Sequence, residues 1–105
     1  KVFFSYDSSS ISHEAQQTLM RQAKWLKDHP TINVIIAGHC DERGTREYNI
    51  ALGERRANAV KGFLAHHGVD SKRIETISYG KERPEVMGDN EAAWSKNRRG
   101  VTELK

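Results

Sequence analysis

The pattern of hydrophobic and polar positions changes its period along the chain and predicts alternating strands and helices. Residues 2–6 are rich in aromatic and β-branched side chains and run into a polar turn, which predicts a first strand. Over residues 13–28 apolar side chains recur at helical spacing, with Ser12 as the N-cap before them and Pro30 after them. We therefore expect an amphipathic helix there, with one face in the core.

The rest of the chain continues the alternation. Residues 31–39 are almost continuously apolar, as in a strand near the middle of a sheet. Further segments predict a long helix ending before Gly68, a third strand, a short helix and a last strand, at about residues 45–66, 74–79, 91–97 and 99–104. The order β-α-β-α-β-(α)-β predicts an α+β fold, a two-layer α/β sandwich with helices packed on a mixed four-stranded sheet.

Length and composition narrow the class of protein. The chain has 105 residues, enough for one domain spanning residues 1–105, and its 30% charged and 36% hydrophobic residues are typical of a globular domain. The only cysteine, Cys40, excludes an intrachain disulfide. The net charge of +3 comes from charges of alternating sign and not from a basic stripe, so nucleic-acid binding is not favoured.

Opposed charges crowd the stretch from Gly38 to Val60. It contains four acids and four arginines: Asp41, Glu42, Glu47, Glu54, Arg43, Arg46, Arg55 and Arg56. Asp41 falls where the second strand ends and the second helix is about to begin, a position at which open α/β sheets commonly bind ligands. Backbone N–H groups at the start of that helix also favour a negative group.

Two polar residues fall on the predicted core face of the long helix. At 100° per residue, this face carries an apolar set that we expect to be buried: Tyr48, Leu52, Ala59, Val60, Phe63 and Leu64. Asn49 and Arg56 lie on the same face of the helix. Together with Gly53, whose missing side chain leaves space, they should line one groove. An arginine cannot be neutralised, so one turned toward the core needs a carboxylate or an anionic ligand. Asp41 and Arg56 together suit a zwitterion, although a structural salt bridge between them is the plainer alternative.

Other kinds of site are less well supported. A metal site at His39, Cys40 and Asp41 is not expected, because adjacent side chains on a strand point to opposite faces. Cys40 lacks a base at a suitable spacing, so we expect no catalysis and no cofactor. By default Trp25 and Trp94 are packing residues, while Arg98 and Arg99 are solvated or ion-paired.

A family resemblance covers almost the whole chain. The run GHCDERGTREYNIALGERRANAV, together with VFFSYD, ISYGKERPEVMG and EAAWSKNRRG, resembles the outer-membrane protein A-like (OmpA-like) C-terminal domain. Within that family the likeness is greatest to the peptidoglycan-associated lipoproteins (Pal). One departure is Cys40, where the family usually has threonine. Cysteine is a weaker hydrogen-bond donor, which affects a minor contact and not the ligand pair.

The resemblance implies noncovalent binding of peptidoglycan through the meso-diaminopimelate residue of its stem peptide. The residues that match the family's gripping pair are Asp41, which would meet the ammonium of diaminopimelate, and Arg56, which would meet its carboxylate. A lower tier of implied contacts comprises Tyr6, Asp7, Thr45, Asn49 and Leu52. No metal or cofactor is implied.

The resemblance also implies a place in the cell. It suggests a periplasmic module of a Gram-negative envelope that tethers the outer membrane to the cell wall. The implied setting is the Tol-Pal system of envelope integrity and cell division, with Tol-system proteins as partners and an N-terminal lipid anchor outside this chain. Alternatives are the wall-binding domain of an outer-membrane barrel or of a flagellar stator protein and, from another class, a cell-wall enzyme.

Overall fold

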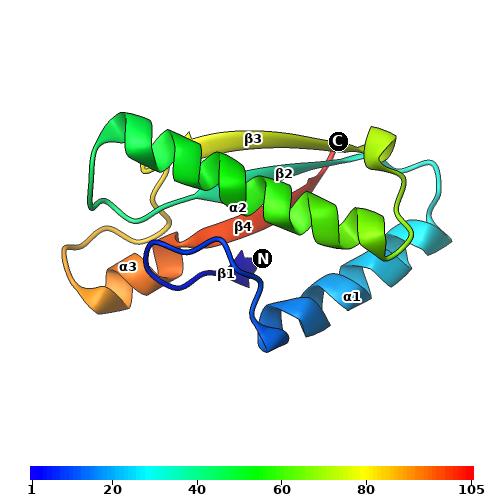
Figure 1. Ribbon diagram of the computed structural model, residues 1–105, viewed down its shortest axis with the longest axis horizontal. Coiled ribbons are helices and arrows are strands. Elements are labelled where there is room, and N and C mark those ends of the chain that lie inside the picture. Colours follow the sequence, from blue (N-terminus) through cyan, green and yellow to red (C-terminus); the bar gives the residue numbers. More distant parts are fainter.

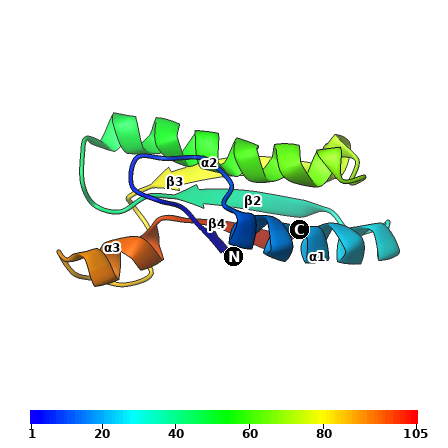
Figure 2. The ribbon, with the colours of Figure 1, turned by 60° about the horizontal axis from the view of Figure 1, so that its bottom comes forward.

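The structure is a computed structural model that describes all residues, 1–105, and places two long helices on one side of a four-stranded sheet (Figures 1 and 2). The elements in chain order are β1 (Val2–Phe3), α1 (His13–Asp28), β2 (Val34–His39), α2 (Arg46–His66), the 3-10 turn η1 (Ser71–Arg73), β3 (Ile74–Gly80), α3 (Glu91–Asn97) and β4 (Arg99–Leu104). The predicted order of elements is confirmed.

The sheet is mixed, as predicted. Its strand order is β1-β4-β2-β3, with β2 and β3 parallel and β4 antiparallel to both β1 and β2. The parallel pair is joined by α2, which crosses over the sheet as right-handed βαβ units do. No helix is long and apolar enough to span a membrane.

Both long helices begin at side-chain caps that the sequence indicates. The Ser12 hydroxyl accepts a hydrogen bond from the N–H of Ala15, and the Thr45 hydroxyl accepts one from the N–H of Tyr48. At the far end of α2, Gly68 adopts φ +100°, a conformation that favours glycine. These local bonds explain why the predicted helix bounds agree with the structure to within one residue.

Two predicted strands are shorter than expected. After Phe3 the chain keeps one further bond, from the N–H of Phe4 to the carbonyl of Arg98, and then leaves the sheet in a turn where Asp7 has φ 51°. That turn extends toward α2, as Figure 2 shows. β2 begins at Val34, and before it the carbonyls of His29 and Ile32 accept hydrogen bonds from the Arg73 side chain.

The core lies between the two long helices and the sheet. The predicted core residues of α1 are all buried: Ala15, Leu19, Ala23 and Leu26. In α2 the residues Leu52, Val60 and Leu64 are buried as expected, but the prediction for Tyr48 is wrong, because it is 45% exposed. Tyr48 lies in the first turn of α2 and donates its hydroxyl to Asp7 at the protein surface.

The backbones of α2 and β2 touch at two glycines. A Cβ added to Gly38 would lie 1.8 Å from the carbonyl oxygen of Gly53, and one added to Gly53 would lie 2.1 Å from Oγ of Ser78. The space that Gly53 provides is therefore filled by the sheet and not by a ligand groove, which corrects the sequence-based expectation. This close approach sets Asn49 and Arg56 over the end of β2.

Gly38→Ala should destabilise the fold by about 3 kcal/mol, the upper part of the usual range for overpacking, because its methyl group meets backbone. Gly62→Ala is the matched control: an added Cβ there meets nothing within 4 Å, and alanine should stabilise the helix by about 0.5–1 kcal/mol. Urea denaturation of both variants measures the two shifts. Equal stability of Gly38→Ala and the wild type would contradict the close contact.

His39, at the end of β2, should make stability depend on pH. It is 5% exposed, its Nδ1 has no hydrogen-bond partner, and burial, then the charges of Arg99 and Arg83, lower its pKa from 6.5 to about 4. As the pH falls, His39 of the unfolded chain binds a proton before His39 of the folded chain does. The contribution of neutral His39 to the free energy of unfolding is therefore complete above pH 6.5 and is lost as the pH falls toward 4. The expected loss is about 3 kcal/mol. Urea titrations between pH 7 and pH 4.5 should show this slope in the wild type and a flatter one in His39→Gln.

Candidate functional site

A small cavity of about 50 Å³ opens where β2 ends and α2 begins. Its lining residues come from the turn after β1, the β2–α2 loop and the first turns of α2: Tyr6, Asp7, Cys40, Asp41, Arg43, Gly44, Tyr48, Asn49, Leu52 and Arg56. Six of the seven predicted site residues are therefore brought together around one cavity. The seventh, Thr45, does not line it and instead caps α2.

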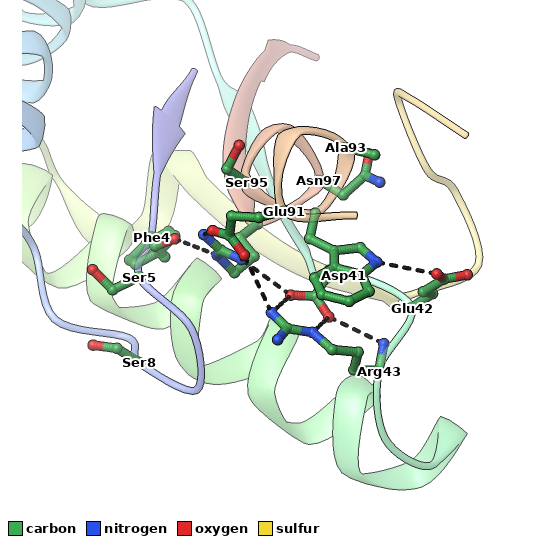
Figure 3. A network of polar contacts seen from close by, with 12 residues as sticks. Phe4, Ser5, Ser8, Asp41, Glu42, Arg43, Glu91, Ala93, Ser95 and Asn97 are labelled. Atoms are coloured by element: carbon green, nitrogen blue, oxygen red, sulfur yellow. Dashed lines mark hydrogen bonds and ion pairs between the residues drawn. The ribbon is translucent and has the colours of Figure 1, made fainter. Parts of the chain in front are cut away.

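Asp41 is a buried carboxylate that two arginines hold in its ionised form. It is 4% exposed. Its Oδ1 accepts from the backbone N–H and from Nε of Arg43, at 3.0 and 3.2 Å, and its Oδ2 accepts from Nη2 of Arg43 at 2.8 Å and from Nη1 of Arg98 at 3.3 Å (Figure 3). Burial alone would raise the pKa of Asp41, but the bonds and charge of Arg43 and the bond from Arg98 outweigh it and lower that pKa.

Arg56 is fully buried, at 0% exposure, and has no carboxylate partner. Its guanidinium donates only to backbone carbonyls: Nε to Ser8 at 2.8 Å, Nη1 to His39 at 2.9 Å and Nη2 to Ser5 at 3.1 Å. Burial lowers the pKa of Arg56, yet a guanidinium remains charged at any accessible pH. Asp41 and Arg56 thus have separate partners, so the alternative of a structural salt bridge between them is wrong.

The loop between β2 and α2 is fixed by its own hydrogen bonds. The Asn49 amide donates to the carbonyl of Arg43 at 2.8 Å, and Gly44 allows the turn with φ +95°. The Cys40 thiol donates to the carbonyl of Asn49 at 3.2 Å, and burial raises its pKa. A thiol held in this form is a poor nucleophile. No three His, Cys, Asp or Glu side chains are grouped so as to hold a metal ion.

Three residues that the sequence did not indicate complete the site. The Arg43 guanidinium lies 3.9 Å from the ring centre of Tyr6 and 4.0 Å from that of Trp94, so Trp94 does more than pack. Arg98 is buried at 6% exposure and binds both Asp41 and Glu91. Of the two earlier alternatives for Arg98 and Arg99, ion pairing is confirmed, because Arg99 is also buried and pairs with Glu85.

The contact between Asp41 and Arg43 could have been predicted from their spacing. An aspartate in a loop before a helix often accepts a hydrogen bond from the backbone N–H two residues further on, and Arg43 is two residues after Asp41. Nothing local could have indicated Arg98, which is 57 residues from Asp41, or Trp94, which belongs to α3. With these residues in place, the site has a carboxylate between two cations and a separate buried cation without a counter-charge.

Comparison with known proteins identifies the family of the chain. The model of the OmpA family matches residues 3–98. The chain is 56% identical over 104 residues to the peptidoglycan-associated lipoprotein of Agrobacterium fabrum, covering 99% of this chain and 59% of that protein. It is 53% identical over 100 residues to that of Haemophilus influenzae, covering 95% and 65%. The chain thus spans about three fifths of the length of these curated relatives.

Solved structures show the same fold. The crystal structure of the peptidoglycan-associated lipoprotein from Burkholderia pseudomallei superposes with a TM-score of 0.96 at 43% identity, covering 99% of this chain and 88% of that one. The C-terminal domain of Helicobacter pylori MotB gives a TM-score of 0.90 at 23% identity, covering 98% and 81%, a likeness of fold alone. From the family match and from the identity to these relatives, the chain belongs to the OmpA family.

Proposed function

We propose that this chain binds peptidoglycan noncovalently, by holding the meso-diaminopimelate residue of the stem peptide between Asp41 and Arg56. One observation carries the proposal. Arg56 is a fully buried cation without a carboxylate partner, and it lines the same cavity as an ionised Asp41. Leaving a buried charge uncompensated is costly, so an anionic group at Arg56 would have a large energetic reason to bind.

The proposed ligand matches this pair of charges. The free end of the diaminopimelate side chain carries an ammonium and a carboxylate on one carbon. Three N–H groups of Arg56 are used by carbonyls, which leaves two of its five for the carboxylate, while Asp41 would receive the ammonium. Tyr6, Asp7, Asn49 and Leu52 would contact the rest of the residue, and Thr45 would support the site by capping α2.

A binding role also agrees with the names of the relatives, which are peptidoglycan-associated lipoproteins and not enzymes. We propose that the chain tethers the outer membrane to the cell wall from the periplasmic face of that membrane, through a lipid anchor outside this chain. Tol-system proteins are proposed partners by family resemblance. The identity of 53–56% to Pal relatives favours this attachment over that of a barrel or a stator protein.

Loss of either charge should weaken binding to purified sacculi. We expect Asp41→Ala and Arg56→Ala each to lose about 2–5 kcal/mol of binding free energy, because each removes one partner of a buried charge contact. Co-sedimentation over a range of protein concentrations measures this, and circular dichroism checks that each variant is folded. The control is Arg55→Ala, since Arg55 is the exposed neighbour of Arg56 and should bind normally. Undiminished binding by both site variants would refute the assignment.

Stem peptides with lysine in place of diaminopimelate should bind poorly. Lysine keeps the ammonium for Asp41 but lacks the carboxylate for Arg56, so we expect a loss of about 1.5–3 kcal/mol, the usual value of a hydrogen bond to a charged group. Calorimetry with the two soluble muropeptides measures the difference. The Arg56→Ala variant should bind the two muropeptides equally. If it still prefers the diaminopimelate muropeptide, Arg56 does not bind the carboxylate and has another role.

A further inference from the structure

Arg43 is clamped over the site by two aromatic rings. Its guanidinium lies 3.9 Å from the centre of the Tyr6 ring and 4.0 Å from that of Trp94. The Trp94 indole is held in turn, because its N–H donates to a Glu42 carboxylate oxygen at 3.0 Å (Figure 3). Such stacking on two faces stabilises a cation in one position. That position is against Asp41.

The carboxylate of Asp41 has no free acceptor site. Two oxygens offer about four lone-pair directions, and four donors already occupy them: the Arg43 backbone N–H, Nε and Nη2 of Arg43, and Nη1 of Arg98. An incoming ammonium therefore has to replace a donor. Three of the four donors belong to Arg43, two of them on its side chain.

Arg43 is the arginine that can leave. Its side chain is 30% exposed, whereas that of Arg98 is 8% exposed and is held by two further partners. These are the carbonyl of Phe4, at 2.9 Å, and the carboxylate of Glu91, at 2.7 Å. Releasing Arg98 would leave the buried carbonyl of Phe4 without this donor, while Arg43 can move into solvent.

The wall of the cavity also includes Arg43. The cavity of about 50 Å³ has room for a few water molecules, each of which needs about 10–15 Å³ of such volume. Arg43 forms part of the cavity wall, so its departure would enlarge the cavity and free Asp41 in one movement.

We propose that Arg43, held by Tyr6 and Trp94, is a built-in competitor that occupies the place of the ligand's ammonium at Asp41. This inference rests on the proposed function and adds a determinant of affinity and selectivity. A ligand with a carboxylate alone cannot replace Arg43, and it leaves Asp41 bound to that side chain. A zwitterion supplies the replacing cation and the anion for Arg56 together. Trp94, which does not line the cavity, is then a positioning residue that acts through Arg43.

The test compares affinities for a soluble disaccharide-tetrapeptide that contains meso-diaminopimelate, measured by calorimetry. Arg43→Gln should bind about fivefold more tightly than the wild type, the scale of one partly exposed ion pair. Trp94→Ala should also bind more tightly, and Trp94→Phe, which keeps an aromatic ring, should stay near the wild type. The control is Arg46→Gln, which removes an equal charge from the exposed pair with Glu82 and should change affinity less than twofold.

A fluorescence measurement follows the movement itself. In the background Trp25→Phe, Trp94 is the only tryptophan. Saturation with the muropeptide should shift Trp94 emission, because the guanidinium leaves its ring, and the shift should be absent when Arg43→Gln is added. A purely structural role of Arg43 would not produce a ligand-dependent shift.

The outcomes separate this inference from the proposed function. Equal or weaker binding by Arg43→Gln, or unchanged Trp94 emission at saturation, would overturn the competitor role while Asp41 and Arg56 stay assigned. A wild-type protein that does not bind the muropeptide, or binding that is unchanged in Asp41→Ala, would refute the proposed function, and the competitor role would fall with it.

Discussion

The burial of the Arg56 guanidinium is the constraint on which the rest of the site depends. A charge that cannot be removed sits at 0% exposure, and only the carbonyl dipoles of Ser5, Ser8 and His39 solvate it. Those carbonyls belong to the turn after β1 and to the end of β2, so one side chain joins both segments to α2. The turn leaves the sheet after Phe3, and the carbonyls of Ser5 and Ser8 in it accept hydrogen bonds from Arg56.

The contact between Gly38 and Gly53 makes this burial possible. With no side chain on either residue, α2 lies on β2 at backbone distance, and the arginine one turn further along can reach the carbonyl of His39. Close packing and the buried charge are therefore parts of one arrangement and not independent features of the fold.

Around Asp41 the charges are unevenly balanced. Arg43 and Arg98 both bind it, Glu91 offsets part of their charge from a more exposed position, and Arg56 adds a further cation to the same region. The hydrogen bonds and charge of Arg43 and the hydrogen bond from Arg98 lower the pKa of Asp41 against the effect of its burial, and the buried Arg56 leaves the region short of an anion. In the proposed function this charge balance favours a ligand that brings a carboxylate, and in the proposed competitor role Arg43 makes an ammonium necessary as well.

The sequence by itself determined the order of elements, the helix ends, the mixed sheet and the inward positions of Asn49 and Arg56. These follow from helical periodicity and from caps such as Ser12 and Thr45, which act over a few residues. Only the tertiary structure decided that Gly53 packs on Gly38, that Tyr48 is exposed, and that Arg98 and Trp94 complete the site. The physical reason is that these contacts join residues far apart in the chain, so no local pattern encodes them.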